Sequence, residues 1–76
     1  MSLSQKTDQI YRIIVAEVRT ARRQAQIPDL DSIIAGLKAE LERDVLAGRF
    51  SDREACEMER AIEIAGEQAR VNWASI

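Results

Sequence analysis

A chain of 76 residues with a formal net charge of −2 is small enough for one domain, and 46% hydrophobic with 32% charged residues excludes a disordered tail. A core of this size supplies only about 3–5 kcal/mol of net stability. The sequence contains no histidine and one cysteine, which removes the side chains most used in zinc sites and in acid–base catalysis.

The first predicted helix covers about residues 4–26. Its apolar residues recur at intervals of three or four, which indicates an amphipathic helix with one buried face. They are Ile10, Ile14, Val18, Ala21 and Ala25. The helix must end before Pro28, because proline disfavours a helical conformation in the residue that precedes it.

The second predicted helix covers about residues 30–47. Asp29 or Asp31 can cap its first turn, since a carboxylate accepts hydrogen bonds from the free backbone N–H groups there. Its apolar stripe consists of Leu30, Ile34, Leu37, Leu41 and Val45. Gly48 follows the last apolar residues and can take the left-handed conformation that ends a helix.

The third predicted helix covers about residues 52–74. Ser51 and Glu54 form a predicted capping box, in which each side chain satisfies the other residue's backbone N–H. The apolar stripe of this helix consists of Ala55, Met58, Ile62, Ala65, Ala69 and Trp73. With Gly48 three residues before Ser51, a helical hairpin is predicted in the middle of the chain.

These elements predict an all-α fold of a single domain, residues 1–76. One alternative is a three-helix antiparallel bundle. The other is a helical hairpin plus an N-terminal helix, in which the hairpin completes its core by dimerisation. Folding the chain back at Gly48 pairs large residues of the second helix with small ones of the third, and Val45 with Ala55. Folding it at Pro28 places Ile14 beside Leu41 and Val18 beside Leu37. The same pairing brings the mid-helix residues Gly36 and Gly66 to within about one turn of the same level, where a close helix crossing would offset their cost of about 1 kcal/mol each; a flexible hinge is the alternative.

Some apolar residues lie outside these stripes. Ile64 and Val71 are seven residues apart on the far side of the third helix, and the first helix has further apolar residues beside its stripe, Tyr11, Ile13 and Val15. Isolated surface apolar residues are common. Two aliphatic residues on one outer face favour an interface, so we expect a homodimer, contact with another protein, or both.

Arginines form a ridge on the first helix, away from its apolar stripe: Arg12, Arg19 and Arg23. Such a ridge is either a solvated face or a contact for an acidic partner. Nucleic-acid binding is the alternative function, but the net charge and the acidic third helix, with Glu59, Glu63 and Glu67 at successive turns, disfavour it. The glutamates are expected to be solvated, because a di-metal bundle site also needs histidines.

The segment from Val45 to Ala55 resembles the start of the helix-turn-helix of LuxR-type regulators, through Leu46-Ala47-Gly48 and Ser51-Asp52-Arg53-Glu54. The resemblance implies a DNA-reading helix after a further turn. No turn signal follows Ala55, so capping chemistry explains the likeness better than a shared function.

The predicted function is therefore that of a non-enzymatic helical interaction or oligomerisation module, such as an adaptor, regulator or assembly subunit. We expect no catalytic residues, no cofactor and no metal. A lone Cys56 and the lack of a long apolar run predict a cytoplasmic protein without a membrane span.

Overall fold

The computed structural model describes residues 2–76, which form three α-helices and one short 3₁₀ helix. They are α1 (Leu3–Arg23), α2 (Leu30–Leu46), α3 (Asp52–Val71) and η1 (Trp73–Ser75). No strand occurs within residues 2–76. The predicted all-α class and three-helix architecture are confirmed, with helix bounds that agree to within about one turn. Met1, part of the predicted domain of residues 1–76, lies outside the described residues.

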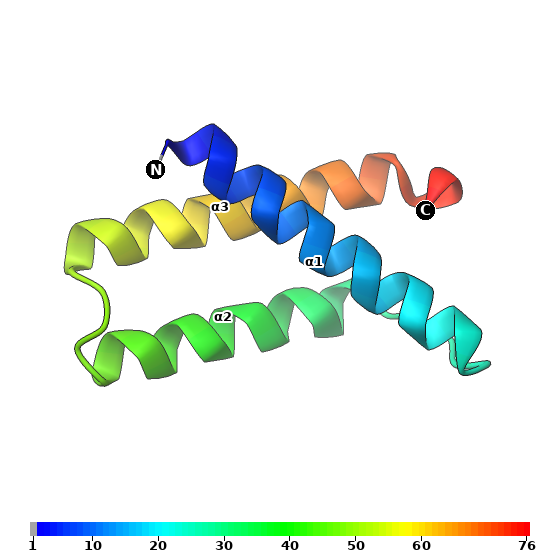
Figure 1. Ribbon diagram of the computed structural model, residues 1–76, viewed down its shortest axis with the longest axis horizontal. Coiled ribbons are helices and arrows are strands. Elements are labelled where there is room, and N and C mark those ends of the chain that lie inside the picture. Colours follow the sequence, from blue (N-terminus) through cyan, green and yellow to red (C-terminus); the bar gives the residue numbers. More distant parts are fainter. Residues whose placement is uncertain (1) are drawn as a thin grey trace.

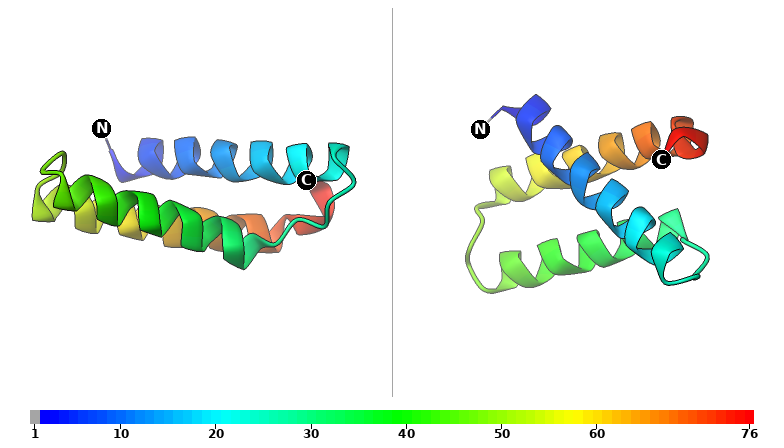
Figure 2. Two further views of the ribbon diagram at one scale, coloured as in Figure 1. Left: turned by 90° about the horizontal axis from the view of Figure 1, so that it is seen from below. Right: turned by 45° about the vertical axis from the view of Figure 1, so that its right-hand side comes forward.

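The helices form two layers. α2 and α3 lie antiparallel in a hairpin, and α1 crosses one face of this hairpin obliquely (Figure 1). Seen from below, α1 forms a layer of its own beside the hairpin (Figure 2, left). The principal extents of the Cα trace, 38 × 23 × 15 Å, agree with this flat shape. One face of the hairpin is therefore left without a covering helix.

α1 packs mainly against α3 and to a smaller extent against α2. The predicted pairing of Ile14 with Leu41 and Val18 with Leu37 assumes that the first two helices run side by side over their whole lengths. In the structure α1 crosses α2 at an angle, so the two helices are not aligned in this way. All three helices contribute to one buried cluster, which consists of Ile10, Ile14, Val18, Leu30, Leu41, Ala61, Ile62, Ala65 and Ala69.

The helix starts follow the capping rules. Ser51 Oγ accepts from the backbone N–H of Glu54 and the Glu54 carboxylate accepts from that of Ser51, both at 3.2 Å, which confirms the predicted capping box. Asp29, and not Asp31, caps α2, since its Oδ1 accepts from the Asp31 N–H at 3.1 Å. Ser2 and Gln5 form a further capping box at α1.

α1 and α2 end in the same way. The Arg49 N–H donates to the Asp44 carbonyl and the Gly48 N–H to the Val45 carbonyl, which is a Schellman motif with Gly48 left-handed at φ 76°. At the end of α1, Gln26 donates to Ala21 and Ala25 to Arg22, with Ala25 left-handed at φ 57°. The first helix therefore ends at Arg23, not Gln26, with an alanine where glycine is usual.

The two mid-helix glycines lie in different surroundings, so the predicted close packing is found at Gly66 and not at Gly36. Gly66 is buried, and a Cβ added to it would lie 2.6 Å from Ile34 Cδ1. Gly36 is exposed, and within the described residues a Cβ there would meet nothing inside 4 Å. Of the two glycines, only Gly66 therefore makes room for a side chain of the neighbouring helix, that of Ile34.

The paired helix ends give opposite predictions for alanine and glycine. Ala25→Gly should stabilise the protein by about 1 kcal/mol, because it removes the steric cost of a left-handed alanine. Gly48→Ala should destabilise it by about the same amount. Urea unfolding followed by circular dichroism measures both. As a control, Ala39→Gly at an exposed position of α2 should destabilise the protein by about 1 kcal/mol. A loss of stability in Ala25→Gly would contradict the prediction.

Candidate interaction surfaces

Two of the predicted interface residues share one surface of α3. Ile64 is half-buried and Val71 is 77% exposed, and together with Glu67, Gln68 and Asn72 they line a shallow apolar depression. We call these five residues the α3 outer patch. Seven residues correspond to two helical turns, about 10 Å along the axis. The structure thus brings Ile64 and Val71 to one continuous surface.

The predicted interface residues of α1 are divided between different surroundings. Ile13 is 45% exposed and lines a depression with Leu37 and Leu41 of α2, not with the α3 outer patch. Tyr11 packs against the core and is half-buried, and Val15 is half-buried as well. Ile13 is therefore an exposed residue at the edge of a depression between the helices, and the structure does not bring it together with Ile64 and Val71.

Sequence reasoning passed over the two most exposed large aliphatic residues among those described. Ile27 is 95% exposed in the connection between α1 and α2, and Leu46 is 82% exposed at the end of α2. Both lie beside chain reversals, next to Pro28 and near Gly48. The signal that could have found them is their place beside the turn residues, where the neighbouring helices diverge from the core.

The arginine ridge, Arg12, Arg19 and Arg23, is exposed on α1. Arg23 Nη2 donates to Thr20 Oγ1 at 3.3 Å, and neither Arg12 nor Arg19 takes part in an ion pair within residues 2–76. Their guanidinium groups are therefore available to solvent or to an acidic partner.

Arg22, beside the ridge, has a structural contact instead. Its guanidinium lies 5.6 Å from the centre of the Trp73 ring and donates a hydrogen bond to the backbone carbonyl of Ile76. A cation over an indole face is attracted by the ring quadrupole. This contact joins the end of α1 to η1, so Arg22 holds the chain end against the bundle.

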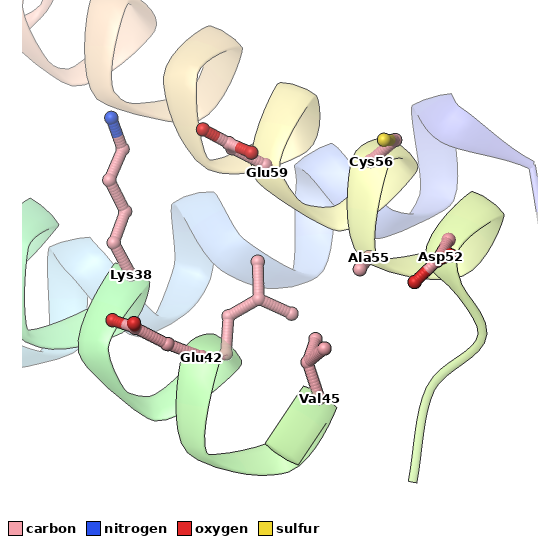
Figure 3. Close-up of a pocket in the computed structure, with 8 residues that line it drawn as sticks. Lys38, Glu42, Val45, Asp52, Ala55, Cys56 and Glu59 are labelled. Carbon is pink, nitrogen blue, oxygen red and sulfur yellow. The ribbon is translucent and has the colours of Figure 1, made fainter. Parts of the chain in front are cut away.

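A groove opens between α2 and α3 near the hairpin turn, on the face that α1 leaves uncovered. We call it the hairpin groove; its lining comes only from α2 and α3 and consists of Lys38, Leu41, Glu42, Val45, Asp52, Ala55, Cys56 and Glu59. Val45 and Ala55 face each other across it (Figure 3), as the pairing predicted across the turn requires. Of its acidic residues, the sequence pattern singles out only Glu59, because Glu42 and Asp52 belong to other turns and to two different helices.

One ion pair joins α1 to α3 in a partly buried setting. Lys6 Nζ lies 2.8 Å from Glu57 Oε2, and the Lys6 side chain is only 12% exposed. The hydrogen bond from Lys6, and then its positive charge, lower the pKa of Glu57 below its ordinary value. The hydroxyl of Ser32 likewise lowers the pKa of Asp29 by donating to its carboxylate at 2.9 Å.

Metal-ligating side chains are dispersed: residues 2–76 contain no group of three or more Cys, Asp or Glu placed to hold an ion. Every buried side-chain nitrogen or oxygen in the same stretch has a hydrogen-bond partner. None of the helices in the described part of the chain is both long and apolar enough to cross a membrane.

Comparisons with known proteins were made by family model, by sequence and by fold, and no family model, curated protein or solved structure matches this chain. The resemblance of residues 45–55 to LuxR-type regulators stops at Ala55 in the structure too. α3 continues unbroken from Asp52 to Val71, with no turn before a separate recognition helix.

The lowered pKa of Glu57 predicts an acid-sensitive contact between α1 and α3. The ionised carboxylate stabilises the folded state above the unfolded-state pKa, and this contribution is lost as the pH falls through the lower folded-state pKa. Between pH 6 and pH 3, Glu57→Gln should therefore lose less thermal stability than the wild type, as measured by melting temperature.

A matched control is Glu17→Gln, since Glu17 is exposed on α1 and is in no ion pair within the described residues. Its melting temperature should fall with pH as in the wild type. Equal losses in Glu57→Gln and wild type would show that the Lys6–Glu57 pair contributes nothing to acid sensitivity.

Proposed function

We propose that the protein is a non-enzymatic helical interaction module that self-associates through the α3 outer patch. The observation that carries the proposal is the exposure of Val71, a large aliphatic residue, on the same depression as Ile64. Burying a side chain of this size contributes about 1.5–3 kcal/mol. Set against a net stability of about 3–5 kcal/mol for a core this small, that gain is considerable.

Charges of opposite sign on α1 and α3 support a defined orientation in the dimer. Glu67 lines the α3 outer patch and Glu63 precedes Ile64, and both carboxylates stay mostly exposed beside their ion-pair partners Arg70 and Lys38, whereas α1 presents the arginine ridge. When copies meet with the ridge of one facing the glutamates of the other, opposite potentials speed encounter and select register. The arginine ridge thus orients the partner, and the aliphatic side chains supply most of the affinity.

The side chains around the grooves favour binding over catalysis. Cys56 is exposed beside Asp52 and Glu59. The chain has no histidine that could act as a general base for this thiol. A reduced lone cysteine also suits a cytoplasmic location, which we include in the proposal.

Substitution of Val71 tests self-association directly. Val71→Glu should shift the solution mass from dimer to monomer, raising the dissociation constant at least tenfold, because it places a charge in the apolar contact beside Glu67. Light scattering with size-exclusion chromatography measures the mass, and analytical ultracentrifugation gives the constant.

Leu46→Glu is the matched control, since Leu46 is equally aliphatic and 82% exposed but lies outside the α3 outer patch. This variant should remain dimeric. A wild-type protein that is monomeric at high concentration, or a dimer dissociated equally by both variants, would refute self-association through this patch.

Nucleic-acid association through the arginine ridge is a second candidate, favoured by the absence of ion-pair partners for Arg12 and Arg19 among residues 2–76. If it operates, a duplex should shift in a gel at low salt, and Arg12→Glu with Arg19→Glu should abolish the shift. Phosphate contacts weaken as salt rises. No shift at low salt would eliminate this candidate.

A further inference from the structure

The hairpin groove is a second surface, on the opposite side of the hairpin from α1. It is confined to the half of the α2–α3 contact nearest the turn. In the other half, ion pairs bridge the two helices: Arg70 to Asp31 at 3.1 Å and Lys38 to Glu63 at 3.6 Å. Lys38 thus stands at the boundary, and its amino group extends toward α3 (Figure 3).

The floor of the groove is apolar and its rim is acidic. Leu41 is buried, and Val45 and Ala55 are half-buried on the floor. The rim carboxylates are Glu42, Asp52 and Glu59, all exposed, and none takes part in an ion pair within residues 2–76. Lys38, the one cation in the lining, is engaged by Glu63. The groove therefore presents apolar surface inside a net negative field.

From this charge pattern we infer that the hairpin groove binds a basic amphipathic helix of another protein. The lining runs from Lys38 to Val45 on α2, which spans about 10 Å, or two turns. A partner helix with aliphatic residues at i, i+3 and i+7 would cover the floor. Lysines or arginines beside that stripe would meet the rim carboxylates, which supply orientation as well as attraction.

A second copy of this chain fits the groove poorly. The arginine ridge has the right charge, but Ala16 and Thr20 lie beside its arginines and the nearest aliphatic residue, Val15, is half-buried, so the ridge offers no fully exposed large aliphatic side chain for the floor. The α3 outer patch has aliphatic side chains, but Glu67 lies among them and would face the rim carboxylates. The occupant must combine both properties, which these surfaces of the chain do not.

The test uses a fluorescein-labelled amphipathic peptide of leucine and lysine, with leucines at i, i+3 and i+7. A second peptide has glutamate in place of each lysine. In fluorescence anisotropy at low salt, the basic peptide should bind the 76-residue chain and the acidic one should not. Because Cys56, the one cysteine of the chain, lines the groove, bound peptide should also slow its alkylation by iodoacetamide.

Paired charge reversals locate the binding. Glu42→Lys with Glu59→Lys should weaken peptide affinity at least tenfold. Glu17→Lys with Glu40→Lys changes the net charge equally at exposed carboxylates outside the groove and should weaken it much less. Equal weakening by both pairs, or binding without protection of Cys56, would overturn the proposal, because the peptide would then bind by general charge attraction.

The outcomes separate this inference from self-association through the α3 outer patch. Val71→Glu should bind the basic peptide as the wild type does, since Val71 does not line the groove. If Cys56 instead becomes protected as protein concentration rises without peptide, a second copy covers the groove and the proposed partner is wrong.

Discussion

The close packing of α1 on α3 is the contact on which the rest of the structure depends. α1 contributes Ile14 and Val18, both fully buried, and α3 contributes small residues with no exposed surface, Ala61, Ala65 and Ala69. Alanines allow two helix backbones to approach while the larger side chains of the other helix fill the space between them. A two-helix hairpin has little core of its own at this size, so the core of the domain is built around α1.

Placing α1 on one face determines where the interaction surfaces lie. Because α1 lies across one face of the hairpin, the opposite face has no covering layer. The hairpin groove, whose lining contains no residue of α1, lies on that opposite face. The α3 outer patch stays exposed for a related reason: α3 already packs against two helices, and Val71 lies outside both contacts. The surfaces proposed for binding therefore follow from having three helices and not four.

Features set by neighbouring residues could be predicted from the sequence, and features set by packing could not. The capping box at Ser51 and the left-handed Gly48 are local, since each depends on a few residues. Ala25 takes the same left-handed conformation as Gly48 although it is not a glycine. For this reason the predicted end of the first helix, Gln26, lies three residues beyond the observed end of α1 at Arg23. Gly36 and Gly66 are identical residues in mid-helix, but only Gly66 meets a neighbour, Ile34. The oblique crossing of α1, and with it the groove, depends on how three surfaces fit together.

The distribution of charge also limits how copies can associate. Contact between different surfaces of two copies generates rings or open filaments, whereas contact of one patch with itself closes a dimer. The hairpin groove is acidic, and the α3 outer patch carries Glu67, so joining these two surfaces brings like charges together. Joining the arginine ridge to the groove satisfies the charges but leaves the apolar floor without an aliphatic partner. A closed dimer through the α3 outer patch avoids both costs, provided that the ridge of each copy reaches the other's glutamates. The groove then stays open on each copy, available to a partner whose side chains this chain does not supply.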